Sequence, residues 1–282
     1  RIVVLGAGES GAGAAVLAAV NNFEVFVSDR GEIDDKYKTL LKDYNVLYEE
    51  KQHSEELILN ADEIIKSPGI PETAPMVVKA RELGIPVISE IEFAARYTNA
   101  VKICITGSNG KTTTTMLIYH ILKKAGLNVG LAGNVGQSFA YQVATKEFDY
   151  YVIELSSFQL DNMYEFKSDL SVLMNITPDH LDRYDHKFQN YIDAKFRILQ
   201  NTTAKDSFIY CSDDEVIINE IAKREILATQ LEFTQKKRNV KRGAMLSEDE
   251  TSINYVNNSS KTLTMLIDDL SIKGKHNVYN SM

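Results

Sequence analysis

The sequence is poor in cysteine and has no excess of positive charge. Its 282 residues include two cysteines, and 31 Lys and Arg stand against 39 Asp and Glu, for a formal net charge of -8. Cys104 and Cys211 lie far apart without the spacing of metal ligands, so we expect buried, reduced thiols in a cytoplasmic protein. The acidic balance argues against a nucleic-acid surface, because neutralising phosphates needs a basic face.

Long apolar runs are absent as well. No run approaches the ~18 residues that a membrane-spanning helix needs, and no signal sequence opens the chain. Internal repeats at solenoid periods and low-complexity tracts are also missing. We therefore expect a protein that binds neither nucleic acid nor membrane. With 282 residues, 44% of them hydrophobic, the chain is long enough for two domains.

One stretch predicts a phosphate site. An apolar strand runs directly into residues 106–113, Thr-Gly-Ser-Asn-Gly-Lys-Thr-Thr, and a helix follows. The glycines let backbone amides approach phosphate oxygens, Lys111 can place its charge on the outer phosphates, and Thr112 can offer its hydroxyl to magnesium. The helix that follows directs the positive end of its dipole toward the same phosphates. The spacing lacks the first glycine of the standard phosphate loop, so a chance Gly-Lys-Thr turn remains the alternative at this point.

Residues 1–96 alternate short apolar strands with helical stretches. This alternation is typical of a parallel sheet with crossover helices, so we expect a Rossmann-like domain over residues 1–96. The turn at residues 6–11, Gly-Ala-Gly-Glu-Ser-Gly, follows the first strand and opens a helix. Asp29 ends the second strand about twenty residues on, as in dinucleotide-binding folds. The same turn can hold any pyrophosphate, or its glycines can serve helix packing alone.

Residues 97–282 need a sheet of their own. We expect strands at residues 102–106, 129–132, 150–154, 170–175 and 208–211. Beyond residue 226 the alternation shortens, which favours antiparallel strands such as 251–255 and 262–267. The predicted fold class is α/β, with an N-terminal Rossmann-like parallel sheet domain and a central P-loop-type α/β ATPase domain that carries an added antiparallel sheet.

Two further segments follow strands close to the expected phosphate site. Glu154 ends a strand, where a carboxylate can hold magnesium directly or through water. His180 lies between Asp179 and Asp182 in a loop just after another strand. A lone histidine is more often structural. Because His180 follows a strand end close to an expected nucleotide site, we treat it as a candidate site residue. Lys195, on a helix expected over residues 191–199, would by itself be a surface charge.

Together these segments resemble one family, the ATP-dependent Mur ligases of peptidoglycan synthesis. The loop at residues 106–112 looks like the family's ATP loop, whose shortened spacing explains the missing glycine. Residues 154–160 are similar to the segment that separates the D-glutamate-adding member from its relatives. The other matching segments are residues 133–136, the loop around His180, residues 194–198 and residues 274–280. The resemblance spans nearly the whole chain.

The resemblance implies roles for the matching residues. ATP would be bound by Gly107, Ser108, Asn109, Gly110, Lys111, Thr112 and Thr113, with Asn277 and Asn280 near adenine and ribose. Two Mg²⁺ ions would be held by Thr112, Glu154, His180 and Lys195. Lys195 would be carbamylated, which turns an ammonium into an anionic oxygen donor. The implied catalytic residues are Lys111, Glu154, His180 and Lys195. The UDP-substrate would be bound by Glu9, Ser10, Asp29, Arg30, Ser67, Pro68, Gly69, Asn134, Ser156 and Gln159.

The implied reaction adds D-glutamate to UDP-N-acetylmuramoyl-L-alanine. ATP would phosphorylate the alanyl carboxylate, and the amine of D-glutamate would attack the acyl phosphate, in a cytoplasmic step of cell-wall synthesis that serves cell shape and division. We expect a monomer. The family has a C-terminal domain that this sequence lacks, so we expect a truncated, poorly active form. The alternatives are another Mur-type or folylpolyglutamate synthetase-like ligase, an NAD-dependent oxidoreductase, and a non-catalytic nucleotide-binding regulator.

Overall fold

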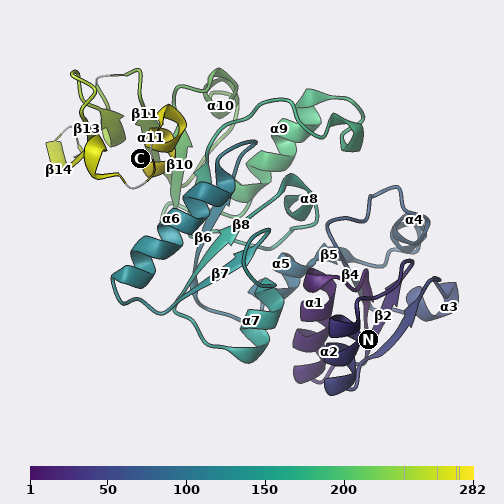
Figure 1. Cartoon of the computed structure of the whole chain (residues 1–282). Helices are drawn as coiled ribbons and strands as arrows, with labels where there is room; N and C mark the ends of the chain where they lie inside the picture. Colours follow the sequence, from purple (N-terminus) through teal and green to yellow (C-terminus); the bar gives the residue numbers. More distant parts are fainter. Residues whose placement is uncertain (238, 259, 271, 273) are drawn as a thin grey trace. The chain divides into compact units, whose positions relative to one another are not determined.

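The computed structural model describes residues 1–237, 239–258, 260–270, 272 and 274–282. These residues form two compact units (Figure 1). The first unit comprises residues 1–100, 130–151 and 157–166, and the second comprises residues 101–129, 152–156 and 167–282. Two segments from the middle of the chain therefore belong to the first unit. The domain boundary expected after residue 96 stays a prediction.

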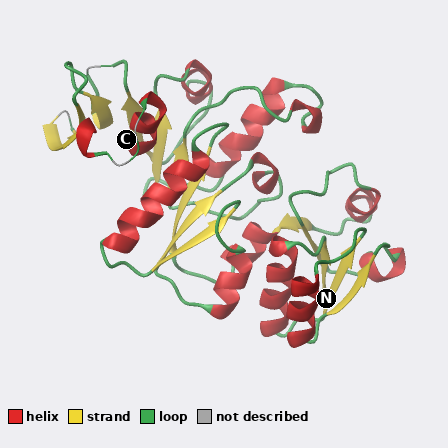
Figure 2. Cartoon of the chain, in the orientation of Figure 1, coloured by secondary structure: helices red, strands yellow, loops and turns green. Residues whose placement is uncertain are grey.

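The first unit contains a parallel sheet whose strands alternate with helices along the chain (Figure 2). Its described strands are β1 (Ile2–Leu5), β2 (Val25–Asp29), β3 (Leu47–Glu50), β4 (Glu63–Lys66) and β5 (Val87–Ser89), in the order β3-β2-β1-β4-β5. Every neighbouring pair is parallel. Strand β1 is buried at all four residues, as expected for a central parallel strand. The Rossmann-like prediction is confirmed.

The helices of the first unit pack closely because one of them is built from small residues. They are α1 (Glu9–Val20), α2 (Asp35–Asp43), α3 (Glu55–Ile58), α4 (Pro75–Glu82), α5 (Glu90–Ala95), α7 (Phe139–Thr145) and α8 (Ser157–Leu160). Helix α1 is buried from Gly11 to Ala18. A Cβ atom on Gly13 would lie 2.0 Å from Ser138 Oγ, just before α7. Gly13 therefore lets α7 approach α1, and this glycine serves helix packing.

The second sheet is mixed. Among the described residues its strands are β6 (Val101–Thr106), β7 (Val129–Gly133), β8 (Tyr150–Glu154), β9 (Leu170–Leu173), β10 (Ser207–Cys211), β11 (Thr229–Thr234), β12 (Arg242–Leu246), β13 (Ser252–Asn257) and β14 (Ser260–Leu266). Their order is β14-β13-β12-β11-β10-β9-β6-β8-β7. The expected antiparallel strands are present as β13 and β14. They extend the central sheet, because β11 pairs in parallel with β10, β12 pairs in parallel with β11, and β13 and β14 follow in antiparallel order.

The remaining helices belong to the second unit. They are α6 (Lys111–Lys124), α9 (Phe188–Phe196), α10 (Glu215–Ile221) and α11 (Lys275–Ser281), with short 3₁₀ turns at Leu181–Arg183, Arg197–Leu199 and Ile267–Asp269. Helix α6 packs on β6, the strand that precedes the predicted phosphate loop. In the part of the chain that the structure describes, every helix is too short or too polar to cross a membrane.

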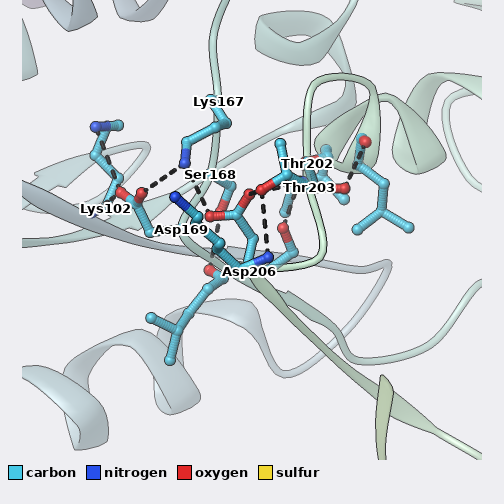
Figure 3. A network of polar contacts seen from close by, with 12 residues as sticks. Lys102, Lys167, Ser168, Asp169, Thr202, Thr203 and Asp206 are labelled. Atoms are coloured by element: carbon cyan, nitrogen blue, oxygen red, sulfur yellow. Dashed lines mark hydrogen bonds and ion pairs between the residues drawn. The ribbon is translucent and has the colours of Figure 1, made fainter. Parts of the chain in front are cut away.

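A polar network joins the amino ends of β6, β9 and β10 (Figure 3). Lys167 Nζ lies 3.2 Å from Asp169 Oδ1 and 2.9 Å from Asp206 Oδ1. Asp169 also accepts the backbone N–H of Lys102 at 2.8 Å, and Asp206 accepts the N–H of Thr203 at 2.7 Å. The phosphate loop leaves the carboxyl end of β6, so this network holds the opposite ends of the strands.

Candidate nucleotide and substrate sites

The loop after β6 has the backbone of a phosphate cradle. Gly110, just before α6, has a φ of 83°, in the left-handed region that side chains disfavour. A Cβ atom there would lie 2.6 Å from Asn280 Oδ1, and a Cβ atom on Gly107 would lie 2.9 Å from Met174 Cβ. Both positions therefore favour glycine for conformation. Gly107 is also confined by space, whereas a Cβ on Gly110 would displace the Asn280 side chain. The predicted turn forms as expected, and α6 begins at Lys111.

Asn175 holds this loop in shape from the neighbouring strand β9. Its carbonyl oxygen accepts the N–H of Ser108 at 2.9 Å, and its Oδ1 accepts the N–H of Asn109 at 2.8 Å. Its Nδ2 donates to the carbonyl of Asn109 at 2.9 Å. The sequence analysis gave Asn175 no role. The signal was a polar side chain directly after an apolar strand, beside the strand that carries the loop.

Two lysines converge on the carbonyl groups of the loop. Lys111 Nζ donates to the carbonyl oxygens of Gly107 and Ser108, both at 3.0 Å. Lys195 Nζ donates to the carbonyl oxygen of Gly107 at 2.7 Å and lies 4.6 Å from the centre of the Tyr191 ring. Lys195 is 1% exposed. Reading Lys195 as a surface charge from its local sequence was therefore wrong, because α9 turns this side chain inward.

Glu154 and His180 lie in different surroundings. Glu154 is 1% exposed at the end of β8. The next residue, Leu155, donates its N–H to Ile105 at 2.8 Å and accepts the hydroxyl of Thr106 at 2.9 Å, which fixes this strand end beside β6. His180 is exposed, with its Nε2 3.5 Å from Asp179 Oδ2.

No described group of three or more His, Cys, Asp or Glu side chains is arranged to hold a metal. The donor chemistry of Thr112 and Glu154 nevertheless fits Mg²⁺, which prefers hydroxyl and carboxylate oxygens. Thr112 is exposed in the first turn of α6, and Thr113 beside it is exposed too. The predicted magnesium ligands stay a prediction.

A cavity of about 280 Å³ opens beside the loop. Its lining residues come from the loop, the ends of β9 and β10, the segment after β11, and α11: Asn109, Gly110, Met174, Asn175, Cys211, Asp213, Asp214, Lys236, His276, Tyr279 and Asn280. Asp213 joins several of these elements. Its carboxylate accepts the hydroxyl of Thr234 at 2.6 Å, the N–H of Gln235 at 2.7 Å and the hydroxyl of Tyr279 at 2.9 Å.

The two predicted asparagines of α11 take different positions. Asn280 lines the cavity, whereas Asn277 accepts a hydrogen bond of 3.0 Å from Asn280 Nδ2. Asp213 and Tyr279 were missed by the sequence analysis, because 66 residues separate them and only the fold brings them together.

The glycine turn of the first unit is organised by Asp29. Its Oδ2 accepts the N–H of Ala7 at 2.6 Å, and its Oδ1 accepts the N–H of Gly31 at 2.7 Å. Ser67 Oγ donates to the carbonyl oxygen of Gly6 at 3.2 Å. Two of the predicted substrate-binding residues, Asp29 and Ser67, are therefore gathered around this turn.

The other predicted substrate-binding residues are more scattered. Glu9 Oε1 accepts the N–H of Ser138 at 3.2 Å and so faces the start of α7. Arg30, Gly69 and Asn134 are exposed, Ser10 and Pro68 are half-buried, and Gln159 is buried in α8. Ser156, also half-buried, belongs to the second unit. Their roles stay predictions.

Comparison with known proteins agrees with this geometry. A family model described as the Mur ligase middle domain matches residues 105–282, and one described as the MurD N-terminal domain matches residues 1–76. The chain is 59% identical to UDP-N-acetylmuramoylalanine--D-glutamate ligase of Bacteroides fragilis and 54% identical to that of Porphyromonas gingivalis. Each match covers 100% of this chain and 62% of the relative, so the chain spans 62% of their length.

Solved structures share the fold. UDP-N-acetylmuramate:L-alanyl-gamma-D-glutamyl-meso-diaminopimelate ligase from Neisseria meningitides has a TM-score of 0.66 at 18% identity, over 99% of this chain and 90% of that one. UDP-N-acetylmuramate-alanine ligase from Thermotoga maritima has a TM-score of 0.58 at 21% identity, over 100% of this chain and 63% of that one. Since the middle-domain match alone covers more than half of the sequence, the chain belongs to the Mur ligase family.

Proposed function

We propose that this chain is the substrate- and ATP-binding part of a ligase that joins D-glutamate to UDP-N-acetylmuramoyl-L-alanine at the expense of ATP. The observation that carries the proposal is the convergence of Lys111 and buried Lys195 on the Gly107 carbonyl, within a glycine loop of a Mur ligase middle domain. The names of the relatives at 59% and 54% identity support D-glutamate as the added residue.

ATP would bind with its phosphates at the loop and its base in the adjoining cavity. Lys111 would move its ammonium from the carbonyls of Gly107 and Ser108 to the outer phosphates. The N-terminus of α6, which begins at Lys111, adds its dipole. The cavity of about 280 Å³ has Asn280 in its lining, which would offer hydrogen bonds to the nucleoside.

Thr112, Glu154, His180 and carbamylated Lys195 would hold magnesium. Bound there, Mg²⁺ supplies positive charge that reduces repulsion between the triphosphate and the incoming carboxylate. Carbamylation of Lys195 is compatible with its contact at Gly107, because a carbamate N–H can still donate to that carbonyl. The chain's own residues would then orient the acyl acceptor, and Lys111 would stabilise the charge that develops on the transferred phosphoryl group.

The first unit would bind the UDP part of the substrate. In NAD-binding folds the carboxylate after the second strand binds a ribose hydroxyl. Here each oxygen of Asp29 already accepts a backbone N–H, from Ala7 and Gly31, so this carboxylate organises the turn. A UDP pyrophosphate at the glycine turn, with Ser67, Pro68 and Gly69 beside it, would leave these bonds intact. The MurD N-terminal domain match over residues 1–76 and the names of the relatives favour the UDP compound over NAD.

The setting would be the cytoplasm, where peptidoglycan precursors are made, and the protein would act as a monomer. The free, buried thiols of Cys104 and Cys211 fit a reducing compartment.

Ligation by the full-length protein tests the proposal. Phosphate release would be measured with ATP, UDP-N-acetylmuramoyl-L-alanine and D-glutamate, for the wild type, Lys111→Ala and the control Lys124→Ala at the exposed end of α6. We expect Lys111→Ala to lower turnover about 100-fold or more, because it removes charge stabilisation in the transition state, with little change in UDP-substrate binding. Unchanged turnover in Lys111→Ala would refute the assignment. Release that needs a different amino acid would indicate another Mur-type ligase.

A further inference from the structure

A lysine ends the buried strand β4. The strand reads Glu-Ile-Ile-Lys, and Lys66 is 2% exposed. Central strands of parallel sheets are usually apolar, and a buried ammonium is unfavourable unless it is paired and hydrogen-bonded. Lys66 Nζ donates to the carbonyl oxygen of Ile70 at 2.7 Å and lies 3.2 Å from Glu72 Oε1. The side chain therefore closes the short loop that contains Ser67, Pro68 and Gly69.

Glu72 connects this loop to a second segment of the first unit. Its Oε1 accepts Asn162 Nδ2 at 2.8 Å, and its Oε2 accepts Arg81 Nη2 at 2.7 Å. Arg81 Nη2 also donates to Asn162 Oδ1 at 2.8 Å, and Asn162 is 1% exposed. Asn162 follows α8 (Ser157–Leu160), the segment that resembles the one specific to the D-glutamate-adding member.

Asn162 is itself anchored to the sheet. Its carbonyl oxygen accepts the N–H of Ser89, at the end of β5, at 2.8 Å. The contacts of Glu72 also keep it ionised. Burial by itself raises the pKa of Glu72, but the Asn162 hydrogen bond and the charges of Lys66 and Arg81 outweigh it and lower the pKa below its usual value. The connection between the two segments is thus a charged, hydrogen-bonded network, with buried Lys66 and Asn162 on either side of the half-exposed pair of Glu72 and Arg81.

We propose that Lys66 and Glu72 are positioning residues that lock the Ser67-Pro68-Gly69 turn and the α8 segment into one arrangement, so that the two ends of a UDP-linked substrate bind cooperatively. This inference rests on the proposed function, which assigns the turn to the UDP end and the α8 segment to the same substrate. Neither residue needs to touch the ligand. Glu72 transmits the position of one segment to the other, and Lys66 fixes the turn.

The test compares UDP with UDP-N-acetylmuramoyl-L-alanine. Both would be titrated into the full-length wild type, Glu72→Gln and the double variant Lys66→Met with Glu72→Gln, which removes both charges together and so avoids an isolated buried ammonium. Lys79→Met is the control, because it breaks the ion pair of Lys79 with Glu55, whose side chains are 45% and 50% exposed. Thermal unfolding reports on the fold of each variant, and affinity for ATP reports on the second unit.

The quantity compared is the ratio of the Kd for UDP to the Kd for the whole substrate. We expect this ratio to fall about tenfold in Glu72→Gln and in the double variant. In ligation, KM for the UDP-substrate would rise, whereas kcat and KM for ATP would stay near the wild-type values. Unchanged affinities for both ligands in a double variant that unfolds at the wild-type temperature and binds ATP normally would overturn this inference alone. A wild type that binds neither UDP compound would overturn the proposed function and this inference with it.

Discussion

Lys195 Nζ and Lys111 Nζ both donate to the carbonyl oxygen of Gly107, at 2.7 Å and 3.0 Å. Before the proposed carbamylation of Lys195, these are two ammonium groups on one acceptor, which repel each other and place positive charge where the loop is shaped for phosphate. One comes from the helix that follows the loop and the other from α9, 84 positions further along the chain. A nucleotide anion would relieve the repulsion.

The first prediction concerns the buried charge of Lys195. Lys195→Met keeps roughly the length of the side chain and removes both a buried nitrogen that is 1% exposed and the site of the proposed carbamylation. The Gly107 carbonyl keeps Lys111 as a donor, so the melting temperature should change little. Ligation by the full-length protein should fall about 100-fold or more, because the group beside the transferred phosphate is lost. Thermal unfolding and phosphate release would be measured together, with exposed Lys205→Met as the control. Normal turnover in Lys195→Met would contradict a catalytic role.

Gly110 and Gly126, at the two ends of α6, provide a matched pair. Both have positive φ, of 83° and 80°, but a Cβ on Gly110 would lie 2.6 Å from Asn280 Oδ1, whereas nothing lies within 4 Å of one on Gly126. Each alanine should lower the free energy of unfolding by about 1 kcal/mol through backbone strain. We expect only Gly110→Ala to weaken ATP binding about tenfold or more, by calorimetry. Equal ATP affinities in the two variants would show that the loop tolerates a side chain.

Glu90 makes the stability of the first unit depend on pH. Burial raises its pKa to about 7, although the N–H of Ala140 at 2.6 Å and the hydroxyl of Ser138 at 2.7 Å favour the carboxylate, and the charge of Glu9 raises the pKa further. Because this pKa lies above the ordinary value of 4.5, the unfolded chain loses the proton first. The stability that protonation supplies is present below pH 4.5 and is lost as the pH rises to about 7.

Glu90→Gln should remove that dependence. Its amide oxygen can still accept from Ser138 and Ala140, and it has no proton to lose. In urea unfolding, the variant should gain stability relative to the wild type between about pH 5 and about pH 8. Exposed Glu82→Gln serves as the control. A stability difference between Glu90→Gln and wild type that is the same at both pH values would be evidence against ionisation of Glu90.

The network at the amino ends of β6, β9 and β10 should respond to acid in the opposite sense. Burial raises the pKa of Asp206, but Lys167 and Thr203 outweigh it and lower the pKa below its ordinary value of 3.8. Its stabilisation is therefore present above that value and is lost as the pH falls through the lowered pKa. Asp206→Asn should lower the free energy of unfolding by about 1–2 kcal/mol near neutral pH, and by less in acid.

ATP affinity should not change in Asp206→Asn, because the network lies at the far ends of the strands from the loop. Denaturant unfolding at neutral and acid pH, with ATP titration beside it, checks both expectations. Weaker ATP binding in a folded Asp206→Asn protein would show that the network at the amino ends of the strands affects the ATP site, and would contradict this expectation.

Features encoded in neighbouring residues were predictable from the sequence. Two units of strand, glycine turn and helix, at residues 2–20 and 101–124, each depend on contiguous residues. Both units are present as expected. The role of the glycines in the turn at residues 6–11 stays a prediction. Gly13, in the helix that follows, has a packing role that depends on Ser138, 125 positions away.

What the sequence did not reveal depends on long-range packing. The local sequence indicated a surface charge at Lys195, and the family resemblance assigned it to the site, but only the fold shows that it donates to Gly107. Asp213 and Tyr279 meet through strands and a helix far apart in the chain. Lys66 is the last residue of β4, and its partner Glu72 lies beyond a proline-containing turn. The parallel addition of β11 and β12 likewise depends on sheet pairing, which local alternation does not specify.

The most direct test of the central claim is calorimetric titration of the protein with UDP-N-acetylmuramoyl-L-alanine and, in parallel, with NAD. The account predicts saturable binding of the UDP compound and no heat from NAD, because residues 1–76 match a MurD N-terminal domain. Binding of NAD without binding of the UDP compound would contradict it and would support an oxidoreductase.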